Sequence, residues 1–225
     1  MALLNYQPPT RPYLRFVYRD EDLLVLDKPH GLLSVPGKAP EHKDSLQLRV
    51  QRVFPSASVV HRLDMATSGL MLFALNKASH RHLSKQFELR EVKKTYYACI
   101  YGEPAKQGKV DAPLICDWPN RPKQIVDMNN GKSALTHYKL IESNKNACLV
   151  ELQPHTGRSH QLRVHMQHIG HPILGDRLYA HPEALAASKR LLLHAQDIAF
   201  RHPSTDASMT FTSPHPFDIK ALKLL

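Results

Sequence analysis

Cysteine is scarce in this 225-residue chain, which contains only Cys99, Cys116 and Cys148. Three scattered thiols form neither a disulfide framework nor a Cys-x-x-Cys metal motif, so we expect a reduced, intracellular protein located in the cytoplasm. The N-terminus lacks the basic and apolar segments of a secretory signal peptide. Apolar runs of roughly 18 residues, which a membrane span needs, are also missing. The sequence therefore predicts no membrane partner.

Several cofactor and nucleophile motifs are missing as well. The chain has no Gly-x-Ser-x-Gly, no Gly-x-Gly-x-x-Gly, no Walker loop and no His-Glu-x-x-His, so we expect neither a nucleotide cofactor nor a serine nucleophile. Five histidines gather within residues 155–171, but no carboxylate lies among them. His160 and His165 are five positions apart, so they do not share one helix face. We predict no metal site, with a histidine-rich metallohydrolase as a competing hypothesis.

Acidic residues are few relative to basic ones. The 30 Lys and Arg residues exceed the 20 Asp and Glu residues, which gives a net charge of +10. Such an excess favours a polyanionic partner, most often nucleic acid. A non-catalytic, basic RNA-binding protein would satisfy this charge as well as an enzyme would, so charge alone does not choose between them.

Short strand patterns outnumber helical ones along the chain. This mixture predicts an α+β fold with a mixed, largely antiparallel sheet flanked by helices and loops. We expect an extended, proline-containing arm over residues 1–14 and one domain over 15–225. Asp44, Asn76 and Ser159 are expected to cap the helices. The helices are expected at 45–53, 77–90 and 160–169, and the strands at 16–18, 23–26, 59–60, 70–75, 95–101, 134–142, 147–152, 191–193 and 209–211.

The most informative stretch is His61-Arg62-Leu63-Asp64-Met65-Ala66-Thr67-Ser68-Gly69. Its lone carboxylate, Asp64, stands in a small, turn-forming run directly before an apolar strand pattern. A nearby arginine favours an ionised carboxylate, which can act as a nucleophile or as a base. An ordinary surface pair of Arg62 and Asp64 in a β-turn is the alternative interpretation.

A second dense cluster covers residues 155–165. Gly157 permits a turn, and Ser159 is expected to cap a helix whose first amides are free to donate. Arg158 and Arg163 would then be held on ordered backbone, in a position suited to phosphate or carboxylate recognition. A capped helix with exposed basic residues is the simpler alternative.

Taken together, the motifs resemble the RluA family of pseudouridine synthases. Six of them follow in the family's order across almost the whole chain. An insert at 114–124 resembles the dual-specificity branch of this family, and the early Lys28-Pro29 motif leaves no room for the S4-type N-terminal domain of other branches. The six motifs are Leu26-Asp27-Lys28-Pro29-His30-Gly31-Leu32, His61–Asp64 with Thr67-Ser68-Gly69, Lys94-Thr95-Tyr96, Gly157–His165, Gly170–Asp176 and Leu191–Ala195.

The resemblance implies an enzyme that isomerises uridine to pseudouridine in stem-loops of 23S rRNA and in a tRNA anticodon loop, without a cofactor. The uridine would be flipped out of its stack into an RNA-binding cleft. Asp64 is then the essential carboxylate, which either attacks the substrate covalently or removes a sugar proton. Arg163 would pair with Asp64, and Tyr96 would stack on the uracil and take the final carbon-bound proton.

The remaining predicted residues bind RNA. By the resemblance, Arg62 fills the gap that the flipped base leaves, and Leu193 belongs to an apolar wall. The insert at 116–132 is irregular, basic and rich in groups that stack on bases or contact phosphate, and we expect it to close over a stem-loop. We expect a monomer. The other predicted RNA-binding residues are Arg158, His160, Trp118, Arg121 and Lys123.

Overall fold

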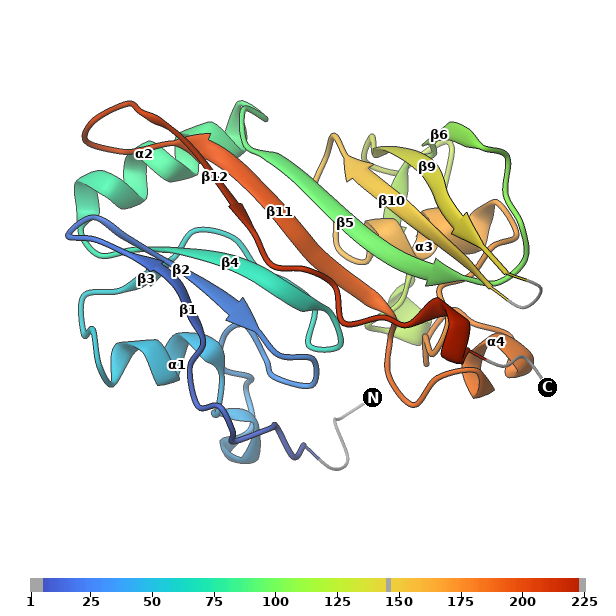
Figure 1. The fold of residues 1–225 in the computed structure, drawn as a ribbon, viewed down its shortest axis with the longest axis horizontal. Coiled ribbons are helices and arrows are strands. Elements are labelled where there is room, and N and C mark those ends of the chain that lie inside the picture. Colours follow the sequence, from blue (N-terminus) through green and yellow to red (C-terminus); the bar gives the residue numbers. More distant parts are fainter. Residues whose placement is uncertain (1–5, 145–146, 223–225) are drawn as a thin grey trace. The chain divides into compact units, whose positions relative to one another are not determined.

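A computed structural model describes residues 6–144 and 147–222 (Figure 1). Its contacts divide the chain into two compact units. The N-terminal unit comprises the chain up to Lys94 together with Ala195–Pro214. The C-terminal unit comprises Thr95–His194 and the segment from His215 onward. The predicted boundaries, an arm over 1–14 and a domain over 15–225, stay a prediction.

The N-terminal unit is built on an antiparallel sheet whose central strands are buried. Strands β1 and β2 form the predicted hairpin, and β2 pairs antiparallel with β4. Every residue of β2 and β4 is buried, as expected for strands with continuous apolar runs. The elements are β1 Phe16–Arg19, β2 Leu23–Lys28, α1 Leu46–Gln51, β3 Ser58–Val59, β4 Ser68–Ala74, α2 Lys77–Glu88, β11 Leu193–Arg201 and β12 Ser208–Thr212.

The C-terminal unit carries four antiparallel strands in the order β5-β10-β9-β6 and a separate two-stranded sheet, β7-β8. Its core includes Cys99, Leu149, Leu174 and Leu192. The elements are β5 Lys93–Ile100, β6 Gln107–Asp111, β7 Leu114–Cys116, β8 Gln124–Val126, β9 Leu135–Ser143, β10 Cys148–Pro154, α3 Gln161–His168 and α4 Pro182–Ala186, with 3-10 turns at Trp118–Asn120 and Ile219–Ala221. A further 3-10 turn, Pro40–His42, lies in the N-terminal unit.

The predicted α+β class with a largely antiparallel sheet is confirmed, but some details were wrong. Ser45, not Asp44, caps α1 by accepting the Leu48 N–H. Asp44 instead forms a two-pronged pair with the fully buried Arg49 side chain, at 2.8 and 2.6 Å. The strand predicted over 191–193 is instead β11, which spans Leu193–Arg201 and shares only Leu193 with the predicted range. The insert at 116–132, predicted to be irregular, begins at the end of β7 and contains β8, which pairs with β7 as a hairpin.

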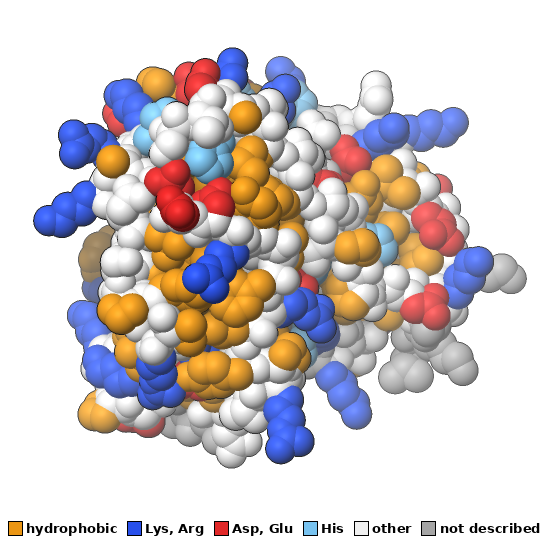
Figure 2. All heavy atoms as spheres, turned by 60° about the vertical axis from the view of Figure 1, so that its left-hand side comes forward, with side chains coloured by type: hydrophobic (Ala, Val, Ile, Leu, Met, Phe, Trp, Pro, Cys, Tyr) orange, Lys and Arg blue, Asp and Glu red, His pale blue; other side chains and the backbone are white. Residues whose placement is uncertain are grey.

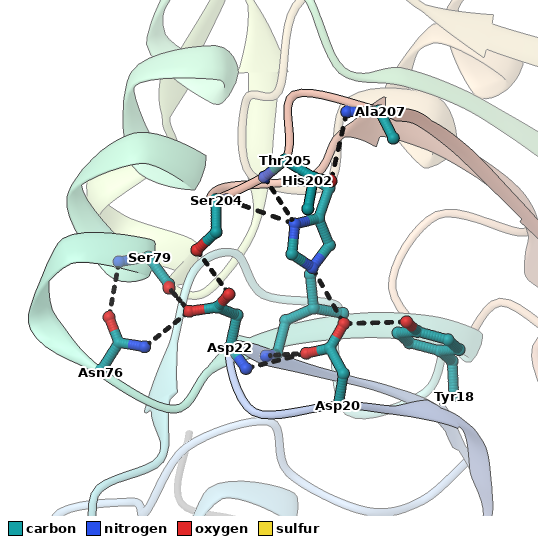
Figure 3. Close-up of polar contacts among 10 residues, drawn as sticks. Tyr18, Asp20, Asp22, Asn76, Ser79, His202, Ser204, Thr205 and Ala207 are labelled. Carbon is teal, nitrogen blue, oxygen red and sulfur yellow. Dashed lines mark hydrogen bonds and ion pairs between the residues drawn. The ribbon is translucent and has the colours of Figure 1, made fainter.

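A polar cluster ties three turns of the N-terminal unit together (Figure 3). The Asp22 carboxylate accepts hydrogen bonds from Asn76 Nδ2, Ser79 Oγ and Ser204 Oγ at 2.8, 2.7 and 2.5 Å. His202 Nε2 lies 2.9 Å from the Asp20 carboxylate. Asn76 also caps α2 as predicted, accepting the Ser79 N–H. The start of α2 is therefore fixed to the β1-β2 and β11-β12 turns.

One face of the molecule carries an uncovered hydrophobic patch with Lys and Arg side chains around and across it (Figure 2). Among the exposed large apolar residues of the N-terminal unit are Phe16, Val17 and Val53. The Arg19 guanidinium of the same unit lies 4.5 Å from the centre of the Phe54 ring. No helix within the described ranges is long and apolar enough to cross a membrane.

Candidate active site

Asp64 opens a tight turn immediately before β4. The Thr67 N–H donates to the Asp64 carbonyl at 3.1 Å and closes the turn, and β4 begins at Ser68. Asp64 is partly buried, whereas Arg62 is exposed. A turn directly before a fully buried strand places the carboxylate on ordered backbone. The predicted position of Asp64 at a strand edge is therefore confirmed.

The buried side chain of Lys28 also holds this turn. Lys28, at the end of β2, has no exposed surface, and its Nζ donates to the carbonyls of Pro29, Leu32 and Met65 at 2.9, 2.8 and 3.2 Å. The Met65 carbonyl also accepts the Gly31 N–H at 2.8 Å. Met65 directly follows Asp64. The Lys28–Gly31 motif thus positions the carboxylate turn, a role that its sequence did not reveal.

Ser34 fixes the residue on the other side of Asp64. Its Oγ donates to the Leu63 carbonyl at 2.5 Å and accepts the Leu63 N–H at 3.1 Å. Both backbone groups of Leu63 are therefore satisfied by one buried hydroxyl. With Lys28 on the far side, the residues flanking Asp64 are anchored by side chains from another part of the chain.

Gly69 explains why the motif ends in glycine. Its φ of +116° lies in the region that favours glycine, and a Cβ there would stand 2.2 Å from the carbonyl oxygen of Ala195. β4 can therefore approach β11 this closely only at a residue without a side chain. The close packing begins five positions after Asp64 and further limits movement of its turn.

The C-terminal unit presents a buried guanidinium. Arg163 on α3 forms a two-pronged ion pair with Asp176, with Nε–Oδ2 and Nη2–Oδ1 distances of 2.8 and 2.7 Å. Arg163 is 5% exposed and Asp176 is 1% exposed. The guanidinium also lies 5.0 Å from the centre of the Tyr179 ring. The orientation of Arg163 is fixed by contacts that do not involve substrate.

Helix α3 starts differently from the prediction. His160, in left-handed backbone with φ of 55°, occupies the cap position in place of Ser159, and the His160 side chain makes no capping bond. The His160 ring nitrogen Nδ1 lies 2.6 Å from the Tyr179 hydroxyl, which holds this conformation. The Gln161 side-chain oxygen accepts the Arg158 N–H at 3.1 Å and so provides a hydrogen-bond partner for this backbone donor just before the helix.

The exposed tip of the insert carries a stacked pair. The Arg121 guanidinium lies 3.5 Å from the centre of the Trp118 ring, and the Trp118 side chain is 62% exposed. The Asp117 N–H donates to the Lys123 carbonyl at 3.0 Å and closes the tip across the base of the β7-β8 hairpin. The tip thus combines a flat aromatic surface with cations, the pattern that single-stranded RNA binds.

Two other predicted residues, Tyr96 and Leu193, both belong to the C-terminal unit. Tyr96 lies on β5 opposite Leu152 of β10, and Leu193 is buried at the start of β11. The predicted pairing of Arg163 with Asp64 joins residues of different units and stays a prediction.

Two other potentially reactive side chains, those of His165 and Cys99, are buried in the protein interior. His165 is fully buried between Thr136 Oγ1 and the Ala112 carbonyl, each at 2.9 Å, and burial lowers its pKa. Burial raises the pKa of Cys99 to about 12, so its thiol stays protonated at neutral pH. Within residues 6–144 and 147–222, no three His, Cys, Asp or Glu side chains are grouped as metal ligands.

Sequence reasoning missed several residues that build the site. Lys28 and Asp176 both lie within motifs noted above, but no role was assigned to either. Buried charges are rare and are usually paired when they occur, so a pattern of apolar neighbours around a charged residue is the signal that could have found them. Ser34 stands outside every motif and offered no such signal.

Comparisons with known proteins show the family to which this chain belongs. The family model described as RNA pseudouridylate synthase matches residues 22–168. Proteins named dual-specificity RNA pseudouridine synthase RluA from Escherichia coli K12 and Pasteurella multocida are 55% and 51% identical over 96% of this chain and 100% of their own length. The solved structure of human RNA pseudouridylate synthase domain containing 1 has a TM-score of 0.78 at 28% identity, covering 95% of this chain and 88% of its own. The chain belongs to the RNA pseudouridylate synthase family.

Proposed function

We propose that this pseudouridine synthase acts on flipped-out uridines in stem-loops of 23S rRNA and in a tRNA anticodon loop, with Asp64 as its essential carboxylate. The observation that carries the proposal is the anchoring of the Asp64 turn on both sides, by Lys28 and by Ser34. Catalytic groups need such preorganisation because small displacements of a reacting atom reduce rate steeply. The dual specificity rests on the names of relatives that match this chain over nearly its whole length.

The reaction breaks the bond between uracil N1 and the ribose, turns the base and forms a bond from the ribose to uracil C5. C5 then loses its proton and N1 gains one, so the product is an isomer of the substrate. Asp64 starts it, either by attacking the substrate or by removing a sugar proton. Arg163, held by Asp176, supplies a fixed positive charge that favours an ionised carboxylate. Tyr96 stacks on the uracil and takes the C5 proton.

The RNA-binding role falls to exposed cations and aromatics. Trp118 and Arg121 offer a stacking surface at the insert tip. Arg62 occupies the space that the flipped base leaves, and Leu193 lines an apolar wall. The remaining members of this predicted set are Lys123, Arg158 and His160.

The substrate assignment is tested with stem-loops that carry tritium at uracil C5. We expect metal-free protein to release tritium from a 23S rRNA stem-loop and from a tRNA anticodon stem-loop, and not from either when cytidine replaces the target uridine. Release from only one of the two would overturn dual specificity. Failure on both, with binding retained, would favour the non-catalytic RNA-binding hypothesis.

We further propose that the enzyme works in the cytoplasm as a monomer. The charge of +10 and the absence of a cysteine framework in the sequence support this proposal. Sedimentation at working concentration tests the monomer. A dimer that persists on dilution would contradict it.

A further inference from the structure

Lys94, at the start of β5, is a partly buried cation with an unusual environment. Its ammonium lies 5.9 Å from the centre of the Phe87 ring, on the last turn of α2. Phe87 in turn stacks on the His61 ring, with centroids 4.8 Å apart and planes inclined by 25°. Among the described residues, no carboxylate lies within ion-pair distance of Lys94.

The neighbouring histidine does not offset this charge. His61 Nε2 accepts the Leu72 N–H at 3.1 Å, so that nitrogen carries no proton. Burial, and secondarily the charge of Lys94, lowers the pKa of His61 to about 3. Burial also lowers the pKa of Lys94. The stack therefore carries one positive charge in apolar surroundings, which is costly without an anion.

Chain geometry relates this cation to the predicted catalytic residues. His61 immediately precedes Arg62 and stands three positions before Asp64. Lys94 precedes Tyr96 by two positions on one strand, so their side chains leave the same face of β5. Lys93 has the same charge but leaves the opposite face and is exposed.

We propose that Lys94 binds an RNA backbone phosphate next to the target uridine, which supplies the anion that the protein lacks. The inference rests on the proposed function, because the phosphodiester arrives with the RNA substrate. Lys94 is then a binding residue that raises affinity and sets the position of the backbone, while Tyr96 on the same strand face contacts the base. Lys93 offers a matched control of equal charge.

The test pairs protein variants with single neutral linkages in the RNA. Stem-loops carrying one methylphosphonate linkage, placed in turn at each position around the uridine, are bound by wild type, Lys94→Gln, Lys94→Arg and Lys93→Gln. Lys94→Gln should weaken binding of the unmodified RNA about tenfold, raise KM more than it lowers kcat, and reduce the salt dependence of log K by about 0.7–0.9. One neutral linkage should weaken wild type and Lys93→Gln, yet leave Lys94→Gln unchanged.

Additive effects of Lys94→Gln and the neutral linkage at every position would overturn the inference, as would unchanged affinity in Lys94→Gln. If Lys94→Gln fails to fold, the Lys94→Arg variant provides the test. A phosphate contact requires that Lys94→Arg keep the wild-type salt dependence of log K and be weakened by the same neutral linkage that weakens wild type. Wild-type tritium release from the unmodified stem-loop is measured first. Absence of that release refutes the proposed function itself, whereas release combined with additive effects refutes only the role of Lys94.

Discussion

Replacing Lys28 with methionine tests whether the carboxylate turn depends on a buried lysine. Methionine keeps an unbranched chain of similar length but removes the Nζ donor to the Pro29, Leu32 and Met65 carbonyls. Hydrogen bonds from a charged donor contribute about 1.5–3 kcal/mol each, and removing the desolvation cost of the buried ammonium offsets part of their sum. The Met65 carbonyl also keeps its bond from Gly31. We therefore expect a net loss of about 3 kcal/mol.

Two assays measure the consequences. A loss of that size in a chain of this length lowers Tm by about 6–12 °C. Turnover at a temperature where the variant remains folded should fall by about 100-fold, because the Asp64 turn loses one of its anchors. Lys38→Met, at an exposed lysine, serves as the control and should leave both quantities unchanged. Wild-type turnover in a folded Lys28→Met variant would refute the idea that Lys28 positions Asp64.

Three further predictions concern packing, the buried ion pair and acid stability. Gly69→Ala should unfold at lower temperature and lose turnover, since its Cβ would stand 2.2 Å from the Ala195 carbonyl oxygen; a thermal scan matching wild type would contradict this. Asp176→Asn should destabilise by about 3–5 kcal/mol in urea titrations, because it removes the buried carboxylate that forms the two-pronged ion pair with Arg163; a change below 1 kcal/mol would argue against the pair. Hydrogen bonds, chiefly from Ser204, lower the pKa of Asp22, so its stabilising effect is complete above the ordinary carboxyl pKa and is lost as pH falls through the lowered one. Asp22→Asn should accordingly make the free energy of unfolding less dependent on pH below about pH 4. An unchanged pH dependence in that range would refute the contribution of Asp22 to acid stability.

Sequence patterns predicted the elements where local signals and burial agree. The hairpin at 16–26 combines apolar runs with an acidic turn, and Asn76 is the one good capping residue before α2. At α1, Asp44 and Ser45 are both able to cap, and the choice depends on Arg49, which draws Asp44 into an ion pair. That contact is tertiary and leaves no periodic signal.

The sequence predicted the reacting carboxylate of the site, but it predicted fewer of the residues that hold this carboxylate in place. Asp64 is marked by a motif, and its turn follows from small residues before an apolar strand. Ser159 failed as a cap because the Tyr179 hydroxyl, distant in sequence, holds His160 in left-handed backbone. The apolar run before Lys28 is consistent with its burial, but lysine is rarely fully buried, and nothing local identifies the three carbonyls that its ammonium binds.

The most direct test of the account is single-turnover tritium release by Asp64→Asn on a stem-loop that wild type converts. Asparagine keeps the size of the side chain and the turn, but it can neither attack the substrate as a carboxylate nor accept a proton. We expect RNA affinity within about twofold of wild type, a difference well under 1.4 kcal/mol, and no release above the no-enzyme blank. Release at the wild-type rate would contradict the assignment of Asp64 as the essential carboxylate.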